Sequence, residues 1–216
     1  MITLYDYYRS TASYRVRIAL NYKNISYQTK AVNLIGDGGE QHQAFYKALN
    51  PQSLVPCLED SDRSLVLSQS LCIIEYLEET YPAPALLPKG PILRAQTRRI
   101  ANIIACDVHP LNNLRVLQYL KHTLNQSEEV RTEWYHHWLK LGFDTIETLL
   151  TQSSAHPYCM GKDITLADVF LIPQVYNARR FNFSLEAYPK ITEIEQACLK
   201  HPAFDKAKPE NQAQEG

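Results

Sequence analysis

A cluster of small hydroxyl residues near the N-terminus offers the first candidate chemistry in this sequence. Ser10, Thr11 and Ser13 follow a short apolar run, Ile2–Tyr7, and a helical pattern begins at once. The backbone N–H groups at a helix start are unpaired, and the helix dipole favours negative charge there. Such a turn can hold an anion, including a thiolate, or its hydroxyls can serve as ordinary N-caps. The local residues leave both interpretations open.

Two further segments could bind a ligand at the ends of expected elements. Pro56 follows Val55 at a strand start, where a cis bond would turn the Val55 backbone outward to pair with an extended peptide. A trans proline that merely opens the strand is the alternative. Gln69 and Ser70 precede the helical run Leu71–Leu77. Their side chains could capture a carboxylate at the helix start or could simply cap it.

A polar segment, residues 107–115, interrupts a long helical pattern. Pro110 removes one backbone hydrogen bond and therefore predicts a kink or a break. His109 and Asn113 are four residues apart and would share a helix face, with Asn112 and Arg115 offset from it. The cluster could form the wall of a polar ligand site or a solvated helix face.

A capping box is predicted where the next apolar run begins. Thr165 is the expected N-cap and Asp168 the expected N3 residue, while Ile164 and Val169 would form a hydrophobic staple. Asp168 is therefore interpreted as structural, and its replacement by Ala should cost about 1 kcal/mol or more.

The remaining polar clusters give weaker signals. Adjacent His136 and His137 would diverge by about 100° on a helix, so they cannot easily share a metal ion. Arg179 and Arg180, near a helix end, could bind a carboxylate or complement the helix C-terminus. The sequence has no metalloprotease, nucleophile-elbow, P-loop or dinucleotide-binding motif. No metal site is expected.

The composition excludes several classes of partner. The chain has 216 residues and a formal net charge of −1, so electrostatics gives no reason to expect nucleic acid or an anionic membrane. No apolar stretch approaches the ~20 residues that span a bilayer, and the N-terminus does not resemble a signal peptide. The odd number of scattered cysteines favours reduced thiols in the cytoplasm: Cys57, Cys72, Cys106, Cys159 and Cys198.

The first eighty residues alternate strand and helix signals. The expected strands are Ile2–Tyr7, Ser26–Asn33, Leu54–Leu58 and Leu65–Ser68, and the expected helices are Ser13–Tyr22, Gln41–Leu49 and Gln69–Thr80. This order predicts a mixed sheet with helices packed against it.

The composition then changes to a proline-rich linker, residues 81–91. Beyond the linker the helical periods are long: Ile92–His122, Glu128–Ser153, Thr165–Arg179 and Ile191–Lys200. The predicted organisation is an α/β domain over residues 1–80 and an all-helical domain over residues 92–216.

These segments resemble the zeta class of glutathione transferases, the class of the maleylacetoacetate isomerases. The resemblance runs from Ile2 to about Phe204. Its most specific part is the hydroxyl turn followed by Arg15–Leu20, and the helical half adds Pro110–Leu114 and the Thr165–Asp168 box.

The resemblance implies a thioredoxin-like N-terminal domain, a helical glutathione-transferase C-terminal domain for substrate binding and dimerisation, and bound glutathione as cofactor. Ser10 and Thr11 are implied to activate the glutathione thiol. Pro56 is implied to be cis, so that Val55 pairs with the cysteinyl unit of glutathione, and Gln69 and Ser70 to hold its γ-glutamyl carboxylate. Further pocket residues are implied at matching positions: Arg15, Gln41, His109, Asn113, Leu114 and Arg115.

One position departs from the family. The family turn usually reads Ser-Ser-Cys, whereas this chain has Ser10-Thr11-Ala12. Thr11 keeps a hydroxyl, but Ala12 cannot act as a thiol. Any isomerisation here must therefore use the sulfur of glutathione itself.

The implied activity is glutathione-dependent cis–trans isomerisation of maleylacetoacetate to fumarylacetoacetate in the breakdown of tyrosine and phenylalanine, by a cytoplasmic homodimer. Such a small dicarboxylate substrate calls for cations, for which Arg180 and Arg115, and then Arg15 and Arg17, are the candidates. Alternatives are a maleylpyruvate isomerase, a transferase acting on small α-halo acids, and a non-catalytic binding protein of the same fold.

Overall fold

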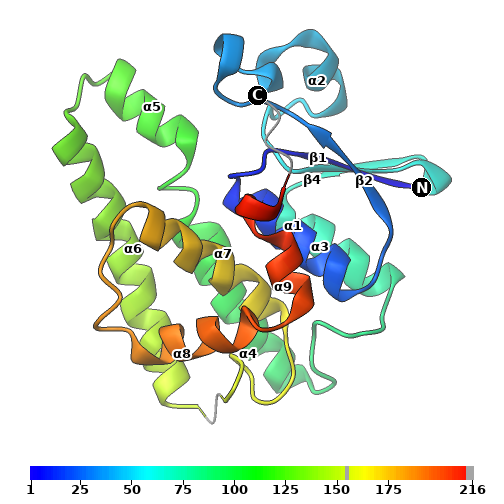
Figure 1. Ribbon diagram of the computed structural model, residues 1–216, viewed down its shortest axis with the longest axis vertical. Coiled ribbons are helices and arrows are strands. Elements are labelled where there is room, and N and C mark those ends of the chain that lie inside the picture. The colour runs from blue at the N-terminus through cyan, green and yellow to red at the C-terminus, as the bar shows by residue number, and fades with distance from the viewer. Residues whose placement is uncertain (154–155, 213–216) are drawn as a thin grey trace. The chain divides into compact units, whose positions relative to one another are not determined.

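A computed structural model describes residues 1–153 and 156–212 of the chain, which form two compact units (Figure 1). The first unit comprises residues 1–85 and 200–212, and the second comprises residues 86–153 and 156–199.

The first unit is built on a four-stranded mixed sheet. Its strands are β1 Ile2–Asp6, β2 Tyr27–Ala31, β3 Cys57–Asp60 and β4 Leu65–Ser68, in the order β2-β1-β3-β4. β1 and β2 are parallel, whereas β3 is antiparallel to both β1 and β4. The parallel pair needs a crossover, which α1 (Thr11–Tyr22) provides.

Two more helices complete the predicted order of elements, α2 (Ala44–Leu49) and α3 (Ser70–Thr80). The fold class is as expected, but β3 starts later in the chain than predicted. Pairing in β3 begins at Cys57, not at Leu54, and the preceding Val55–Pro56 bond is cis.

A short C-terminal helix, α9 (Pro202–Ala207), packs on α1. Phe204 is fully buried, and the Arg17 Nε donates to the Ala207 carbonyl at 3.0 Å. The sequence placed this segment in the helical domain. Tertiary contacts with α1 instead assign it to the first unit, because a buried guanidinium must find acceptors nearby.

The second unit is helical in its described residues. It contains α4 (Pro91–Asn102), a π-helical turn (Ile103–Val108), α5 (Leu114–His122), α6 (Glu128–Thr151), α7 (Leu166–Arg180) and α8 (Pro189–Cys198). The break predicted at Pro110 is present, because the chain leaves helical structure between the π-helical turn and α5. At Gly142 of α6, a Cβ would lie 2.2 Å from the Val108 side chain, so only glycine allows this close approach.

α7 forms the core of the second unit. Residues 166–175 are all buried, and the predicted capping box starts the helix. The Asp168 Oδ2 accepts hydrogen bonds from the Thr165 N and Oγ1 at 2.8 and 2.9 Å.

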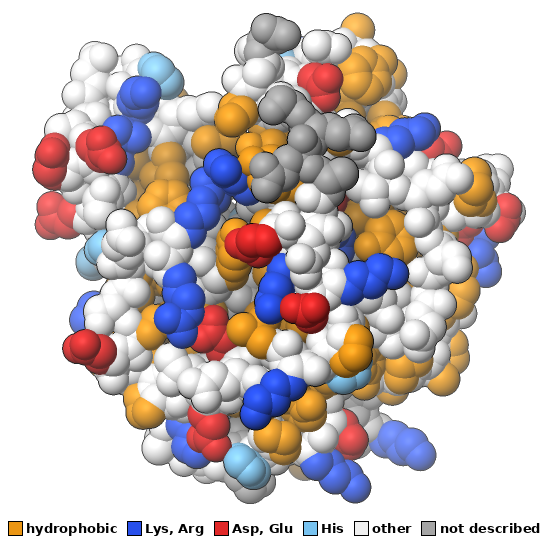
Figure 2. All heavy atoms as spheres, in the orientation of Figure 1, with side chains coloured by type: hydrophobic (Ala, Val, Ile, Leu, Met, Phe, Trp, Pro, Cys, Tyr) orange, Lys and Arg blue, Asp and Glu red, His pale blue; other side chains and the backbone are white. Residues whose placement is uncertain are grey.

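The surface has no single dominant charge on the face drawn in Figure 2, where acidic and basic side chains are interspersed. None of the helices in residues 1–153 and 156–212 is long and apolar enough to cross a bilayer.

Candidate active site

The strand register brings three predicted ligand-binding segments to one end of the sheet. Tyr5 near the end of β1 pairs with Cys57 at the start of β3, and Cys57 pairs with Ser68 at the end of β4. The turn after β1, the residues before β3 and the residues after β4 therefore leave the sheet at the same end. These are the segments of Ser10, of Val55–Pro56 and of Gln69–Ser70.

Ser10 occupies the N-cap of α1. Its Oγ accepts a hydrogen bond from the Ser13 N at 3.2 Å, while Thr11 is the first residue of the helix and is largely buried. Capping uses the oxygen as an acceptor and leaves the hydroxyl proton available to donate. The capping and anion-binding interpretations of this turn are therefore compatible.

Residues of α2 and of the loop that follows α2 bind the backbone of the segment before β3. The Tyr46 hydroxyl and the Asn50 Nδ2 each donate to the Leu54 carbonyl at 2.7 Å. The cis Val55–Pro56 bond agrees with the resemblance. Val55 lies just outside the β1–β3 ladder, so its backbone is at the position where an extended peptide could be added.

The start of α3 is tied to α1 by a buried arginine. The Arg15 Nη1 donates to the Ser70 Oγ at 3.3 Å, and Arg15 is only 1% exposed. Gln69 precedes the helix with a φ of +72°, and its Nε2 donates to the Gln52 Oε1 at 2.6 Å. Arg15 therefore joins the predicted thiol turn and the predicted carboxylate site in one hydrogen-bonded scaffold.

Gln41 has a buried acceptor that points to a ligand. Its Nε2 donates to the Leu34 carbonyl at 3.4 Å, whereas its Oε1 has no hydrogen-bond partner among residues 1–153 and 156–212. The side chain packs on Gly39, which has a φ of +90° and where a Cβ would lie 2.4 Å from the Gln41 Nε2. Burying an amide oxygen without a partner is costly, so a ligand N–H here would be stabilising.

Arg17 does not serve as a substrate-binding cation. Its side chain is fully buried, its Nη1 lies 2.7 Å from both carboxylate oxygens of Asp6, and its Nη2 donates to the Tyr8 carbonyl at 3.0 Å. The expectation that Arg17 could bind the substrate was wrong, because its guanidinium is buried and already paired with Asp6 and the Tyr8 carbonyl.

The second unit carries the other predicted residues in two segments. Asn113 is the N-cap of α5 and accepts from the Arg115 N at 3.1 Å, while Leu114 is 38% exposed and Arg115 is exposed. His109 lies in the non-helical segment between the π-helical turn and α5. The prediction that His109 and Asn113 share one continuous helix face was wrong, because α5 starts afresh at Asn113.

Arg180 ends α7 and is exposed. Its Nη1 lies 3.5 Å from the Asn177 Oδ1, and its guanidinium carbon lies 5.5 Å from the centre of the Phe181 ring. Its neighbour Arg179 instead forms a bidentate ion pair with Glu195. Of the two adjacent arginines, Arg179 is thus already paired with a carboxylate of the described chain.

Two residues that adjoin the predicted segments were not singled out from the sequence. Arg9 is an exposed cation directly before Ser10, with its guanidinium carbon 5.1 Å from the centre of the Tyr8 ring. Its place next to the hydroxyl turn was a usable signal. Tyr135 of α6 is fully buried and receives a hydrogen bond from Asn177. An aromatic residue in a helix predicts only core packing, so nothing local identified it.

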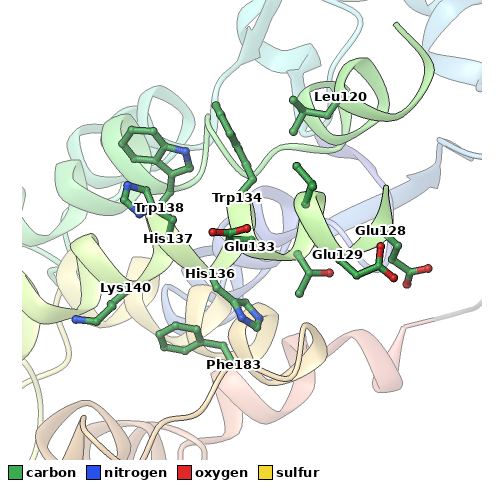
Figure 3. A pocket seen from close by; sticks show the side chains of 12 residues that line it. Leu120, Glu128, Glu129, Glu133, Trp134, His136, His137, Trp138, Lys140 and Phe183 are labelled. Atoms are coloured by element: carbon green, nitrogen blue, oxygen red, sulfur yellow. The ribbon is translucent and has the colours of Figure 1, made fainter. Parts of the chain in front are cut away.

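A groove of about 1130 Å³ follows α6 and includes none of the predicted residues. Figure 3 shows Trp134 and Trp138 on one side of α6, and His136 and Phe183 on the other. No cluster of His, Cys, Asp or Glu suited to a metal ion occurs in the described part of the chain.

Comparisons with known proteins identify the family of this chain. The sequence matches the family models of the glutathione S-transferase N-terminal domain over residues 4–85 and C-terminal domain over residues 112–206. A probable maleylacetoacetate isomerase of Vibrio cholerae is 49% identical, over 98% of this chain and 97% of its own length. The holo structure of a maleyl pyruvate isomerase, a bacterial zeta-class glutathione S-transferase, is 43% identical with a TM-score of 0.94, covering 99% of this chain and 100% of that one. The maleylacetoacetate isomerase of Methylobacterium extorquens AM1, solved with malonate and glutathione, is 36% identical with a TM-score of 0.93, covering 99% of both chains.

Proposed function

Because the chain belongs to the glutathione S-transferase family, in its zeta class, we propose that it catalyses the glutathione-dependent cis–trans isomerisation of maleylacetoacetate to fumarylacetoacetate. The observation that carries this proposal is the strand register. It gathers the Ser10 turn, Val55–Pro56 and Gln69–Ser70 at one end of the sheet.

The residues at this end suit an extended tripeptide with a carboxylate and a thiol. The start of α3 at Ser70 offers unpaired N–H groups to the γ-glutamyl carboxylate, and Arg15 holds the Ser70 hydroxyl in place. Val55 offers backbone groups to the cysteinyl unit. The unpartnered Gln41 Oε1 would accept from a ligand N–H.

Ser10 and Thr11 would stabilise a thiolate. A free thiol has a pKa near 8.5 and is mostly protonated at neutral pH. When bound, glutathione would supply a thiolate for reversible addition to the conjugated double bond, which becomes a single bond that can rotate until elimination restores the double bond. The Ser10 hydroxyl and the N-terminus of α1 favour the charged sulfur. Ala12 excludes a protein thiol from this step.

Arg115 and Arg180 are the proposed partners of the substrate carboxylates, because both are exposed in the second unit. Arg15 is only 1% exposed and contacts Ser70. We therefore assign Arg15 to the glutathione side, through Ser70. His109, Asn113 and Leu114 are proposed to line the same ligand site.

A direct assay tests the proposal. Purified protein is mixed with maleylacetoacetate, with and without glutathione, and fumarylacetoacetate formation is followed. Glutathione-dependent product formation is expected. A protein that binds glutathione in calorimetry but produces no product would instead be a non-catalytic binding protein.

Maleylpyruvate is the second candidate substrate, since the chain is 43% identical to a maleyl pyruvate isomerase with a TM-score of 0.94. The same arginines suit either diacid. The ratio of kcat/KM for maleylacetoacetate and maleylpyruvate, with a small α-halo acid as a third substrate, decides which activity dominates.

The biological setting belongs to the same proposal. We place the protein in the cytoplasm, in tyrosine and phenylalanine breakdown, and its five free cysteines suit a reducing compartment. We propose a homodimer, for which the 74% exposed Ile92 and 46% exposed Leu93 of α4 offer apolar surface. Sedimentation equilibrium measures the oligomeric state directly.

A further inference from the structure

Two consecutive residues of α6, Trp134 and Tyr135, contact the segment that leads into α5. The Trp134 Nε1 donates to the Leu111 carbonyl at 2.8 Å, and the Tyr135 carbonyl accepts from the Asn112 Nδ2 at 3.0 Å. The break in the helical pattern is thereby held against α6. Arg115 follows three residues after Asn112.

The same stretch of α6 also contacts the end of α7. The Tyr135 hydroxyl accepts from the Asn177 Nδ2 at 2.9 Å, and the Tyr135 ring stacks on Phe181 at 3.9 Å and 12°. The His136 Nε2 lies 2.8 Å from the Phe181 carbonyl. A carbonyl can only accept, so this ring nitrogen carries the proton.

Arg180 lies between these two α7-side contacts. Its Nη1 lies 3.5 Å from the Asn177 Oδ1, and its guanidinium lies over the Phe181 ring. The two residues that touch Arg180 are thus the residues that Tyr135 and His136 hold. Figure 3 shows Trp134 and His136 on opposite sides of α6, as one helix needs in order to reach two separate segments.

We propose that residues 134–136 of α6 form a frame that fixes the distance between the Arg115 and Arg180 segments, and so select the length of the dicarboxylate substrate. This inference rests on the proposed function, in which both arginines bind carboxylates. Tyr135 is fully buried within a helix of 24 residues, which gives the frame its stiffness. Binding groups misplaced by about 1 Å lose much of their effect, so a stiff frame gives selectivity.

Trp134, Tyr135 and His136 are positioning residues in this scheme, because none of them needs to touch the substrate. Burial raises the pKa of the Tyr135 phenol well above its usual range, so the hydroxyl stays protonated during turnover.

Competitive inhibition by unbranched dicarboxylates of increasing chain length tests the frame. Wild-type enzyme should prefer one length over its neighbours by about tenfold. Tyr135→Phe removes one hydrogen bond but keeps the ring stack, and His136→Ala frees the Phe181 carbonyl. In both variants, the preference for one dicarboxylate chain length over its neighbours should fall to about threefold or less. The KM for glutathione should stay unchanged. His137→Ala is the matched control, because this exposed neighbour packs on Trp138 and should keep the wild-type preference.

Folded Tyr135→Phe and His136→Ala proteins that retain the wild-type length preference would overturn the proposal and reduce these residues to core packing. A wild-type enzyme with no length preference would overturn it as well. If Tyr135→Phe does not fold, judged by circular dichroism, the half-buried His136→Ala variant decides alone. Calorimetry with the same dicarboxylates measures the length preference by binding alone, even if the enzyme isomerises neither maleylacetoacetate nor maleylpyruvate. The absence of isomerisation would reject the proposed function separately.

Discussion

The starts of α1 and α7 both have a hydroxyl residue as N-cap, but the polar groups at the two helix N-termini find different partners. At α7, the Asp168 carboxylate accepts from the Thr165 N and Oγ1 and also from the Cys159 N at 2.7 Å. At α1, the cap is Ser10 and the first turn contains no acidic residue. When a carboxylate follows a hydroxyl cap at position N3, the protein itself pairs the polar groups at the helix start. We call such a helix start closed, and one without the carboxylate open. Without that carboxylate, the positive end of the helix remains for a ligand anion.

The largest effect should follow from removing both hydroxyls at the open helix start. Ser10→Ala combined with Thr11→Val should lower kcat by ~10²-fold or more, because both hydroxyls assigned to stabilising the thiolate are lost. Steady-state kinetics at saturating glutathione measures this loss. Loss of the Ser10 cap should itself cost only about 1 kcal/mol of stability.

The matched control for this variant is Ser127→Ala. Ser127 caps α6 in the same way, with its Oγ accepting from the Val130 N at 3.4 Å. It should lose a similar amount of stability and keep full activity. Equal activity losses in both variants would mean that capping, and not thiol activation, explains the effect at Ser10.

The closed helix start should show the reverse pattern. Asp168→Ala removes the acceptor for hydrogen bonds from Thr165, Cys159 and Cys198, so the free energy of unfolding should fall by about 2 kcal/mol. Turnover per folded molecule should stay the same. Burial raises the pKa of the Asp168 carboxyl, against hydrogen bonds from the Cys159 and Thr165 backbone that lower it.

Urea unfolding measures this change, with Asp163→Ala as the control. Asp163 is exposed and lies five residues earlier, so its loss should cost under about 0.5 kcal/mol. If Asp168→Ala lost activity but not stability, the interpretation of Asp168 as purely structural would be wrong.

A smaller effect is expected at a second open helix start, that of α3. Ser70→Ala removes the hydroxyl that Arg15 holds and that we assign to the γ-glutamyl carboxylate. The KM for glutathione should rise by about tenfold, equivalent to one charge-assisted hydrogen bond, with kcat retained at saturation. A fall in kcat with an unchanged KM would contradict this assignment and indicate that Ser70 acts in the catalytic step.

Local patterns were sufficient for most of the fold. The order of strands and helices, the break at Pro110 and the box at Thr165 each depend on residues within one or two turns of each other. The assignment of α9 to the first unit depends instead on a long-range contact, because Ala207 accepts a hydrogen bond from Arg17, 190 positions earlier in the chain. Short helices of this kind are placed by tertiary contacts that no local window contains.

The site divides in the same way. The hydroxyl turn and the α3 start could be identified from sequence as open helix starts, but local chemistry could not separate caps from ligand sites. The register Tyr5–Cys57–Ser68 that gathers them is a long-range property. The buried roles of Arg15 and Arg17 were equally invisible, because a charged residue in a helix usually predicts an exposed one.

The smallest effect concerns a third kind of helix start, one whose cap can titrate. The His201 Nδ1 accepts from the Ala203 N at 3.2 Å at the start of α9. Burial lowers the pKa of His201 below its ordinary value of 6.5. The neutral ring is the capping form, so its contribution is fully present above pH ~6.5 and is lost as the pH falls through the folded-state pKa.

Wild-type stability should therefore fall on acidification by up to about 1 kcal/mol more than that of His201→Asn, whose amide caps at every pH. Thermal unfolding of both proteins between about pH 7.5 and 5 measures the difference and cancels the contribution of all other titrating groups. Parallel curves would show that α9 does not depend on this cap. A difference that also changed turnover would link α9, through Arg17 and the Tyr8 carbonyl, to the open start of α1.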